Sequence, residues 1–266
     1  MSAAGFSKRN EMNDSKKAIF ITVRTNSTRL PRKALLEING TSTIEHVIHR
    51  VKRSKKAEAI VLCTTELEED DVLCEIAQTN GIFFHRGSVK DKLDRWRGAA
   101  IKYSIEFFVT ADGDDLFCEP ELIDLAFEQY EGSRPDFIEA ANVVCGAFTY
   151  GIKTAALLRV CEIKDTDDTE MMWVYFKETG IFKVEDLRGV DELYKRPDIR
   201  MTLDYPEDFE FFRNVIENLG IVNPDFGLRD IIRYLDQNPE VIRINQHLHS
   251  QWAENQKKKT QLVLKN

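Results

Sequence analysis

The stretch "AIFITVRTNSTRLPRK", residues 18–33, joins an apolar run to a strongly basic loop. The run "AIFITV" is continuously apolar, which is typical of a strand in a parallel sheet that is buried on both faces. The loop after it carries Arg24, Arg29, Arg32 and Lys33. Ligands of open α/β sheets bind at the carboxyl ends of the strands. This loop is therefore the first candidate for an anion-binding site.

The side chains of this loop suit phosphate oxygens. Guanidinium groups can contact two oxygens at once, and a lysine adds a point charge. The hydroxyls of Ser27 and Thr28 can add hydrogen bonds, and Pro31 stiffens the loop because its ring fixes φ. The chain contains no P-loop motif and no G-x-G, so side chains rather than a glycine-rich loop would hold the phosphates. The alternative is a solvated surface loop whose arginines pair with acidic residues.

The composition limits the classes of function. The chain has 266 residues, of which 42% are hydrophobic and 31% are charged, as in a globular protein with one large domain. Its net charge of -8 argues against nucleic acid as a partner, because phosphate neutralisation needs a basic face. We see no signal peptide and no apolar run that could span a bilayer, so we expect no membrane partner. The five cysteines form no C-x-x-C pair, which favours free thiols and a cytoplasmic location.

Between a leader at residues 1–17 that we expect to be disordered and a loose tail at residues 251–266, strands and helices alternate. This order predicts one domain over residues 18–250 with a Rossmann-like α/β fold, in which helices cover both faces of an open, mostly parallel (mixed) sheet. The helix after the first strand begins with a capping box, Ser42 and Glu45. We predict strands at 18–23, 58–65, 82–87, 106–115, 136–144, 182–187 and 199–204, and helices at 42–54, 68–81, 91–103, 120–130, 206–220 and 228–238.

Acidic residues also follow a predicted strand end. Asp112, Asp114 and Asp115 follow the apolar run "EFFVTA", and Asp204 precedes a helix that opens at Pro206. Carboxylates are the ligands that Mg²⁺ prefers, and Mg²⁺ is commonly shared with substrate phosphates. The alternatives are a polar turn for the first group and a helix cap for Asp204.

Together these pieces fit nucleotidyl transfer. That reaction needs cations around a triphosphate, a metal at the α-phosphate and an aligned acceptor oxygen. Positioning and charge neutralisation dominate such chemistry, so few reactive side chains are needed.

Several motifs now resemble one known family. "VRTNSTRLPRKAL", residues 23–35, is similar to the signature A-R-x-x-S-x-R-L-P-x-K of the cytidylyltransferases that activate acidic sugars. That family includes the acylneuraminate and 3-deoxy-manno-octulosonate cytidylyltransferases, and the closest resemblance is to its branch named for spore coat polysaccharide biosynthesis protein F. The resemblance covers most of residues 18–245. It includes "TIEHVIHRVKRS", "FHRGSVKDKLDRWRGAA", "GDDLFCEPELID", "LDYPEDFEFFRNV" and "LRDIIRYLDQNPEVIRIN".

The resemblance implies a fold of the nucleotide-diphospho-sugar transferase type and an enzyme that uses CTP and Mg²⁺ and releases pyrophosphate. The product would be the CMP or CDP derivative of a small acidic or phosphorylated acceptor, made for surface polysaccharide or glycan biosynthesis. By motif position, Arg24, Lys33 and Asp114 would be catalytic, and Asp114 and Asp204 would bind the metal. The nucleotide would be bound by Arg24, Ser27, Arg29, Lys33, Thr64, Thr65, Ser88 and Arg95, with Arg86 as a weaker candidate.

The departures from the family concern the acceptor. Where this branch reads G-L-D-V-E-V-F, the chain reads "GAFTYGI" at residues 146–152, so Phe148 and Tyr150 replace two acidic positions. The sugar pocket therefore looks rebuilt, while the CTP chemistry looks retained. The family also implies a homodimer, with residues 146–185 as the dimerisation or acceptor region. Two other functions stay open: a glycosyltransferase that uses a nucleotide-sugar, and a nucleotide-binding protein without catalysis.

Overall fold

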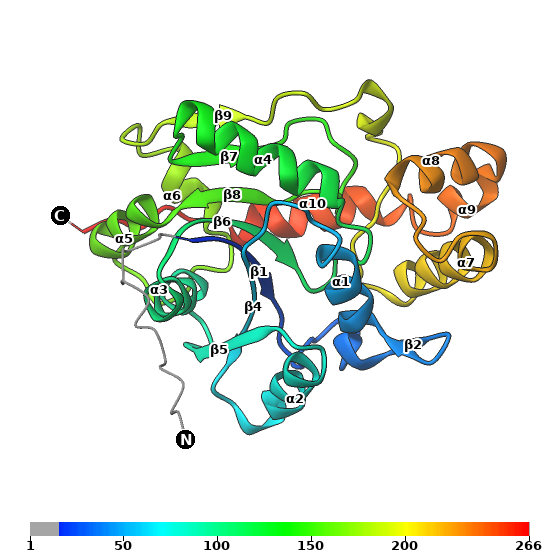
Figure 1. The fold of residues 1–266 in the computed structure, drawn as a ribbon, viewed down its shortest axis with the longest axis horizontal. Coiled ribbons are helices and arrows are strands. Elements are labelled where there is room, and N and C mark those ends of the chain that lie inside the picture. The colour runs from blue at the N-terminus through cyan, green and yellow to red at the C-terminus, as the bar shows by residue number, and fades with distance from the viewer. Residues whose placement is uncertain (1–15, 266) are drawn as a thin grey trace, which may run out of the picture.

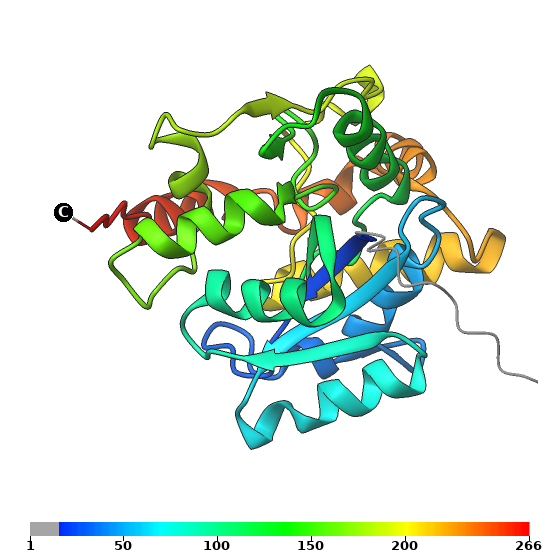
Figure 2. The same cartoon turned by 60° about the vertical axis from the view of Figure 1, so that its left-hand side comes forward.

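The computed structural model describes residues 16–265, and its centre is a seven-stranded sheet (Figures 1 and 2). The strand order is β5-β4-β1-β6-β8-β7-β9. Strands β5, β4, β1 and β6 are parallel, β8 is antiparallel to both β6 and β7, and β9 is parallel to β7. The predicted open, mostly parallel mixed sheet is confirmed. The strands are β1 Lys16–Thr22, β4 Ala59–Thr65, β5 Phe83–Gly87, β6 Ile105–Asp112, β7 Phe137–Glu139, β8 Tyr150–Lys153 and β9 Val184–Asp186.

Helices cover both faces of the sheet. The side chains of β1 alternate between the two faces: Ile19 and Ile21 enter one core, and Ala18 and Phe20 enter the other. Helices α1, α2, α4, α7, α8 and α9 line the first core, and α3, α5 and α6 line the second. The helices are α1 Thr43–Val51, α2 Asp71–Thr79, α3 Lys92–Tyr103, α4 Pro120–Ser133, α5 Thr154–Ile163, α6 Trp173–Lys177, α7 Pro206–Val222, α8 Leu228–Gln237 and α9 Pro239–Arg243.

A short β-hairpin and three turns of 3-10 helix complete the fold. The hairpin pairs β2 with β3 between the basic loop and α1. One 3-10 turn begins at Lys33, at the end of the basic loop. The hairpin strands are β2 Glu37–Ile38 and β3 Thr41–Ser42, and the 3-10 helices are η1 Lys33–Leu35, η2 Glu68–Asp70 and η3 Glu192–Tyr194.

Two predicted strands differ from the structure. The strand expected at residues 136–144 pairs only over β7, and residues 199–204 form no strand beyond a single bridge between Cys145 and Arg200. The first of these strands is followed by a turn at residues 141–142, where Asn142 adopts a φ of +64°, and the second is limited by Gly146, which adopts a φ of +87°. A Cβ at this position would lie 1.8 Å from the carbonyl oxygen of Met201, so only glycine allows this close backbone contact. The turn at Gly146 ends the pairing after one bridge.

The two ends of the chain also differ from expectation. The leader predicted at residues 1–17 lies outside the described residues up to residue 15, and Lys16 and Lys17 already belong to β1. The tail predicted to be loose instead forms helix α10, Leu248–Lys259. The segment after α10 returns to α5, because Asp165 N–H donates to Val263 and Lys265 N–H donates to Ile163 over 2.9 and 2.8 Å. These backbone bonds explain how a polar segment with little apolar surface is held in place.

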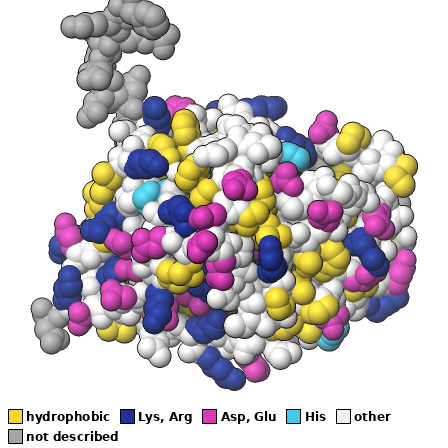
Figure 3. All heavy atoms as spheres, turned by 90° about the horizontal axis from the view of Figure 1, so that it is seen from below, with side chains coloured by type: hydrophobic (Ala, Val, Ile, Leu, Met, Phe, Trp, Pro, Cys, Tyr) yellow, Lys and Arg dark blue, Asp and Glu magenta, His cyan; other side chains and the backbone are white. Residues whose placement is uncertain are grey.

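The surface agrees with the mixed charge of the sequence. On the face shown in Figure 3, basic and acidic side chains are interspersed instead of forming one basic surface. Among residues 16–265, no helix combines the length and the apolar character that crossing a bilayer requires.

The capping box of α1 gives a direct test of the fold. Glu45 N–H donates to Ser42 Oγ, and Ser42 N–H donates to Glu45 Oε2 over 3.1 Å. We expect Ser42→Ala to lower the free energy of unfolding by about 1 kcal/mol, because the first turn of the helix loses a cap. Urea unfolding followed by circular dichroism measures this change. Ser250→Ala, at an exposed position of α10, is the matched control, and an equal loss in both variants would contradict the capping role.

Candidate active site

The carboxyl ends of the four parallel strands meet at one edge of the sheet. Thr22, the last residue of β1, is in register with Cys63 of β4 and with Asp112 of β6, and Thr65 is in register with Gly87 of β5. The basic loop therefore starts beside the acidic turn that follows β6. The fold brings the two oppositely charged segments of the sequence to the same place.

Lys33 lies at the centre of this edge. Its ammonium group donates to Asp114 Oδ2 over 2.8 Å, to Asp204 Oδ1 over 2.9 Å and to the carbonyl oxygen of Leu203 over 2.6 Å. Thr43 Oγ in turn donates to the carbonyl oxygen of Lys33 over 2.6 Å, which ties the loop to the start of α1. The structure thus brings together Lys33, Asp114 and Asp204, which are far apart in the sequence.

Asp204 is held from both sides. Arg29 donates to its Oδ1 over 2.5 Å, and Arg200 Nη2 lies 3.4 Å from its Oδ2. Arg200 also donates to Asp208, and Asp208 accepts the backbone N–H of Asp204 over 2.8 Å and of Tyr205 over 3.0 Å. Asp208, and not Asp204, therefore caps α7. This network fixes the direction of the Asp204 carboxylate toward Lys33.

The charges at this edge stabilise one another. Burial opposes the charge of Lys33, but Asp114 and Asp204 outweigh it and raise the pKa of the ammonium group above its usual range. Burial likewise opposes the charge of Asp204, but Lys33 and Arg29 lower the pKa of this carboxyl. The pKa of Arg29 is also raised by Asp204, so Arg29, Lys33 and Asp204 stay charged near neutral pH. The site is a network of alternating charges.

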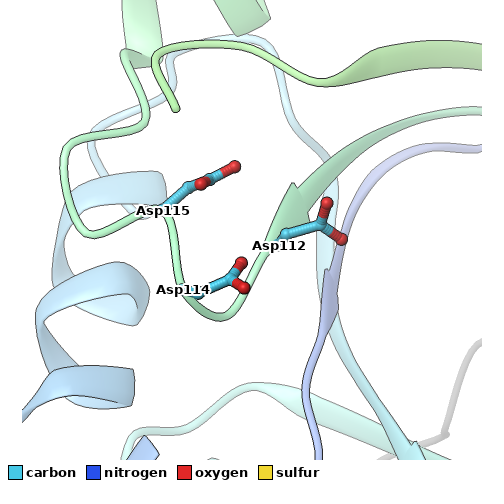
Figure 4. A group of neighbouring side chains, drawn as sticks. All are labelled: Asp112, Asp114 and Asp115. Atoms are coloured by element: carbon cyan, nitrogen blue, oxygen red, sulfur yellow. The ribbon is translucent and has the colours of Figure 1, made fainter. Parts of the chain in front are cut away.

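Three aspartates form a compact acidic group next to Lys33 (Figure 4). Carboxylate oxygens of Asp112, Asp114 and Asp115 all lie within 4.8 Å of one another. Burial and then the neighbouring carboxylates Asp114 and Asp112 raise the pKa of Asp115 well above its usual value. Lys92 approaches Asp112 to 3.8 Å and its ammonium group also lies 5.5 Å from the ring centre of Trp96. Hard oxygen ligands at this spacing fit a divalent cation such as Mg²⁺.

The family resemblance implied Asp114 and Asp204 as the metal ligands. In the structure Lys33 lies between these two carboxylates, whereas Asp112 and Asp115 are the acidic neighbours of Asp114. The role of Asp204 as a ligand stays a prediction. Asp112 and Asp115 are additional candidates, and the signal for them was present in the sequence as the acidic turn "DGDD".

A second group of candidate residues lies at the ends of β4 and β5. Thr64 Oγ and the Nε and Nη1 atoms of Arg95 are buried and have no hydrogen-bond partner among the described residues. Buried polar groups without a partner are rare in proteins and indicate a missing ligand or water. In contrast, Thr65 Oγ donates to Asp70, and Ser88 Oγ accepts the N–H of Asp91 over 3.1 Å. Thr64 and Arg95 are therefore the members of this group that are free to bind a ligand.

Asp70 is a site residue that the sequence did not reveal. It is fully buried and accepts both the backbone N–H and the hydroxyl of Thr25 over 2.7 Å, as well as the hydroxyl of Thr65. It therefore fixes the start of the basic loop against the end of β4. The only signal was its place in the acidic run "EEDD", residues 68–71, which sequence patterns alone assign to a helix start.

The remaining loop residues lie apart from Lys33. Arg24 is exposed and approaches Glu170 to 3.9 Å instead of joining the contacts of Lys33. Ser27 is half-buried, and Arg32 is exposed. Arg86 donates to the carbonyl oxygens of Thr65 and Leu67, which gives it a structural contact in this state.

Phe148 and Tyr150, at the positions that the resemblance assigns to the acceptor region, pack into the protein. Phe148 packs against the first core, and the ring of Tyr150 lies 5.0 Å from that of Phe137 in the second. Both aromatic rings therefore contribute to core packing.

Comparison with known proteins places this geometry in a family. The cytidylyltransferase family model matches residues 18–236. An uncharacterized protein of Methanocaldococcus jannaschii is 32% identical over 86% of this chain and 93% of its own length. Spore coat polysaccharide biosynthesis protein SpsF of Bacillus subtilis is 28% identical over 83% of this chain and 94% of its own. The chain therefore belongs to the cytidylyltransferase family and is a nucleotidyltransferase enzyme, as the motifs predicted.

Solved structures agree with this assignment. A cytidylyltransferase from Leptospira borgpetersenii superimposes with a TM-score of 0.77 at 28% identity, covering 86% of this chain and 97% of its own. The CMP-2-keto-3-deoxy-manno-octonic acid synthetase complexed with CTP gives a TM-score of 0.60 at 17% identity, over 77% of this chain and 99% of its own. The second comparison shows a shared fold.

The position of Lys33 between carboxylates predicts competition with a metal ion. We expect Lys33→Met to bind free Mn²⁺ several-fold more tightly than the wild type without nucleotide, because a neighbouring positive charge is removed from the acidic group. Electron paramagnetic resonance of free Mn²⁺ measures the binding. Arg32→Gln removes the same charge from an exposed position of the same loop and should leave the affinity unchanged. Equal Mn²⁺ binding by Lys33→Met and the wild type would contradict the competition.

Proposed function

We propose that the protein transfers the CMP group of CTP to an oxygen of a sugar acid or sugar phosphate and releases pyrophosphate, for surface polysaccharide or glycan biosynthesis. The observation that carries the proposal is the contact of Lys33 with both Asp114 and Asp204 at the carboxyl edge of the sheet. This contact unites a cationic group for phosphates with anionic groups for a metal. The names of the related proteins SpsF and 3-deoxy-manno-octulosonate cytidylyltransferase support the class of acceptor.

The basic loop would hold the triphosphate. Arg29 and Lys33 already converge at the edge, and their charges are neutralised by aspartates in the absence of a ligand. Arg24 and Ser27 lie on the same loop and would contact the phosphates from its other side. As the bond to the α-phosphate breaks, negative charge grows on the leaving pyrophosphate, and these groups stabilise it.

The nucleoside would bind at the ends of β4 and β5. Thr64 Oγ and the guanidinium group of Arg95 are buried without partners, and the carbonyl and hydroxyl groups of a nucleoside can satisfy them. Thr65 and Ser88 would shape the same region, since their hydroxyls already hold the ends of the surrounding loops.

Mg²⁺ would be held by Asp114 together with Asp112 and Asp115 or with Asp204. When bound, the ion supplies positive charge to the phosphate oxygens and so favours attack at the α-phosphorus. The carboxylates orient the nucleotide through their fixed positions, which Lys33 and Arg200 maintain on the Asp204 side. The cytoplasmic location and the homodimer through residues 146–185 stay predictions.

The proposal is tested by pyrophosphate release. Wild-type protein with Mg²⁺ is incubated with each of four nucleoside triphosphates and a panel of keto-sugar acids and sugar phosphates. We expect release with CTP and with one class of acceptor. No release with CTP and any acceptor, together with retained CTP binding in calorimetry, would instead indicate a nucleotide-binding protein without catalysis.

Substitution of Asp114 tests the role of the acidic group. We expect Asp114→Asn to lower the rate of pyrophosphate release by about 10²–10³-fold, because one charged contact to the reacting groups is lost. Thermal unfolding checks that the fold is intact. Asp225→Asn, at an exposed position, is the control and should retain the full rate. A rate near that of the wild type in Asp114→Asn would refute the assignment.

A further inference from the structure

Helix α10 lies outside the part of the chain that the family model matches. The model ends at residue 236, and α10 spans Leu248–Lys259. Figure 1 shows α10 as the red helix that begins beside α8 and α9 and runs toward α5 and α6.

The start of α10 contacts the Asp204 side of the site. The guanidinium carbon of Arg200 lies 5.0 Å from the ring centre of Trp252, a distance typical of a cation–π contact. Arg200 in turn contacts Asp204, which contacts Lys33. Trp252 is thus separated from the Lys33 contacts by only two side chains.

The end of α10 contacts Glu170, which lies near Arg24 of the basic loop. Lys259 Nζ lies 3.3 Å from Glu170 Oε1, and Glu170 lies 3.9 Å from Arg24 of the basic loop. Lys259 follows Trp252 by seven residues, which is a rise of about 10 Å along a helix. The helix therefore contacts Arg200 through Trp252 and Glu170 through Lys259, and these two residues contact Asp204 and Arg24 in turn.

One face of α10, which includes Trp252, is half-buried against the protein. Residues at spacings of three, four and seven lie on one face of a helix, so Asn255 and Gln256 share the face of Trp252 and Lys259. Trp252, Asn255 and Gln256 are half-buried. The other positions between residues 251 and 258 are all exposed: Gln251, Ala253, Glu254, Lys257 and Lys258.

Two donors near this face have no partner. Trp252 Nε1 and Arg200 Nη1 are buried and form no hydrogen bond among the described residues, and Arg200 is only 1% exposed. Buried donors of this kind call for an acceptor such as a water or a ligand oxygen. They are the second observation, besides the position of the helix, that points to a bound molecule.

We propose that α10 forms one wall of the acceptor site and selects a sugar that carries a carboxylate or phosphate group. The proposal rests on the proposed function and deepens it. The indole of Trp252 covers the apolar face of the sugar, and the amides of Asn255 and Gln256 bond to its hydroxyls. Lys259 binds the anionic group, which takes the place of the Glu170 carboxylate that now lies near both Lys259 and Arg24.

The test uses the full-length protein with Mg²⁺, CTP and the acceptor of the panel that gives the fastest pyrophosphate release. We expect Lys259→Ala and Asn255→Ala each to raise the KM for the acceptor about tenfold, while the KM for CTP changes less than twofold. Lys258→Ala removes the same charge from the exposed face and should change neither constant. If both KM values rise together, or if neither rises, the proposal that α10 lines the acceptor site is contradicted. The helix then has only a structural role.

The two proposals can fail separately. If the wild type releases no pyrophosphate with any member of the panel, the proposed function fails. The role of α10 is then decided by calorimetry of the same sugar acids and sugar phosphates on the wild type and on Lys259→Ala. Tighter binding of a sugar acid or sugar phosphate by the wild type than by Lys259→Ala supports the role of α10 in the acceptor site. Equal binding by the two proteins, or no binding by the wild type, contradicts it.

Discussion

The ammonium group of Lys33 is the contact on which the candidate site depends. It joins three segments that are distant in the sequence: the basic loop after β1, the acidic turn after β6 and the segment before α7. Without it, Asp114 and the buried Asp204 would lie near each other with less compensation, and a buried charge that loses its partner is strongly destabilising. The same contact therefore sets both the shape of the site and its charge.

This arrangement has a consequence for ligand binding. Two cations of the edge are neutralised by carboxylates: Arg29 by Asp204, and Lys33 by both Asp204 and Asp114. A triphosphate alone would have to displace carboxylates from these cations, and a metal ion alone would have to approach an acidic group beside an ammonium group. When the two arrive together, each charged group of the protein exchanges one partner for another. The pairing of charges at this edge thus favours joint binding of nucleotide and metal.

The sequence predicted those features that follow from strand ends. The apolar runs located the four parallel strands, and because their carboxyl ends share an edge, the basic loop and the acidic turn had to meet there. Other features depend on contacts between distant side chains, which no local pattern encodes. Asp70 holds Thr25 and Arg200 holds Asp204 only because the fold places them side by side. The tail at residues 251–266 was expected to be loose, but most of it forms α10, and long-range backbone bonds anchor the segment that follows the helix.

The residues discussed above lie partly inside and partly outside the segment that the family model matches. The charged residues that we propose to bind phosphates and metal all lie within residues 18–236, the segment that the family model matches. Phe148 and Tyr150 pack partly into the two cores, and helix α10, beyond the matched segment, contacts Arg200 and Glu170. In the proposal for the acceptor, another element that borders the site would therefore contribute to selection. Helix α10 is such an element, which is why relatives inform the chemistry of this protein better than the identity of its acceptor.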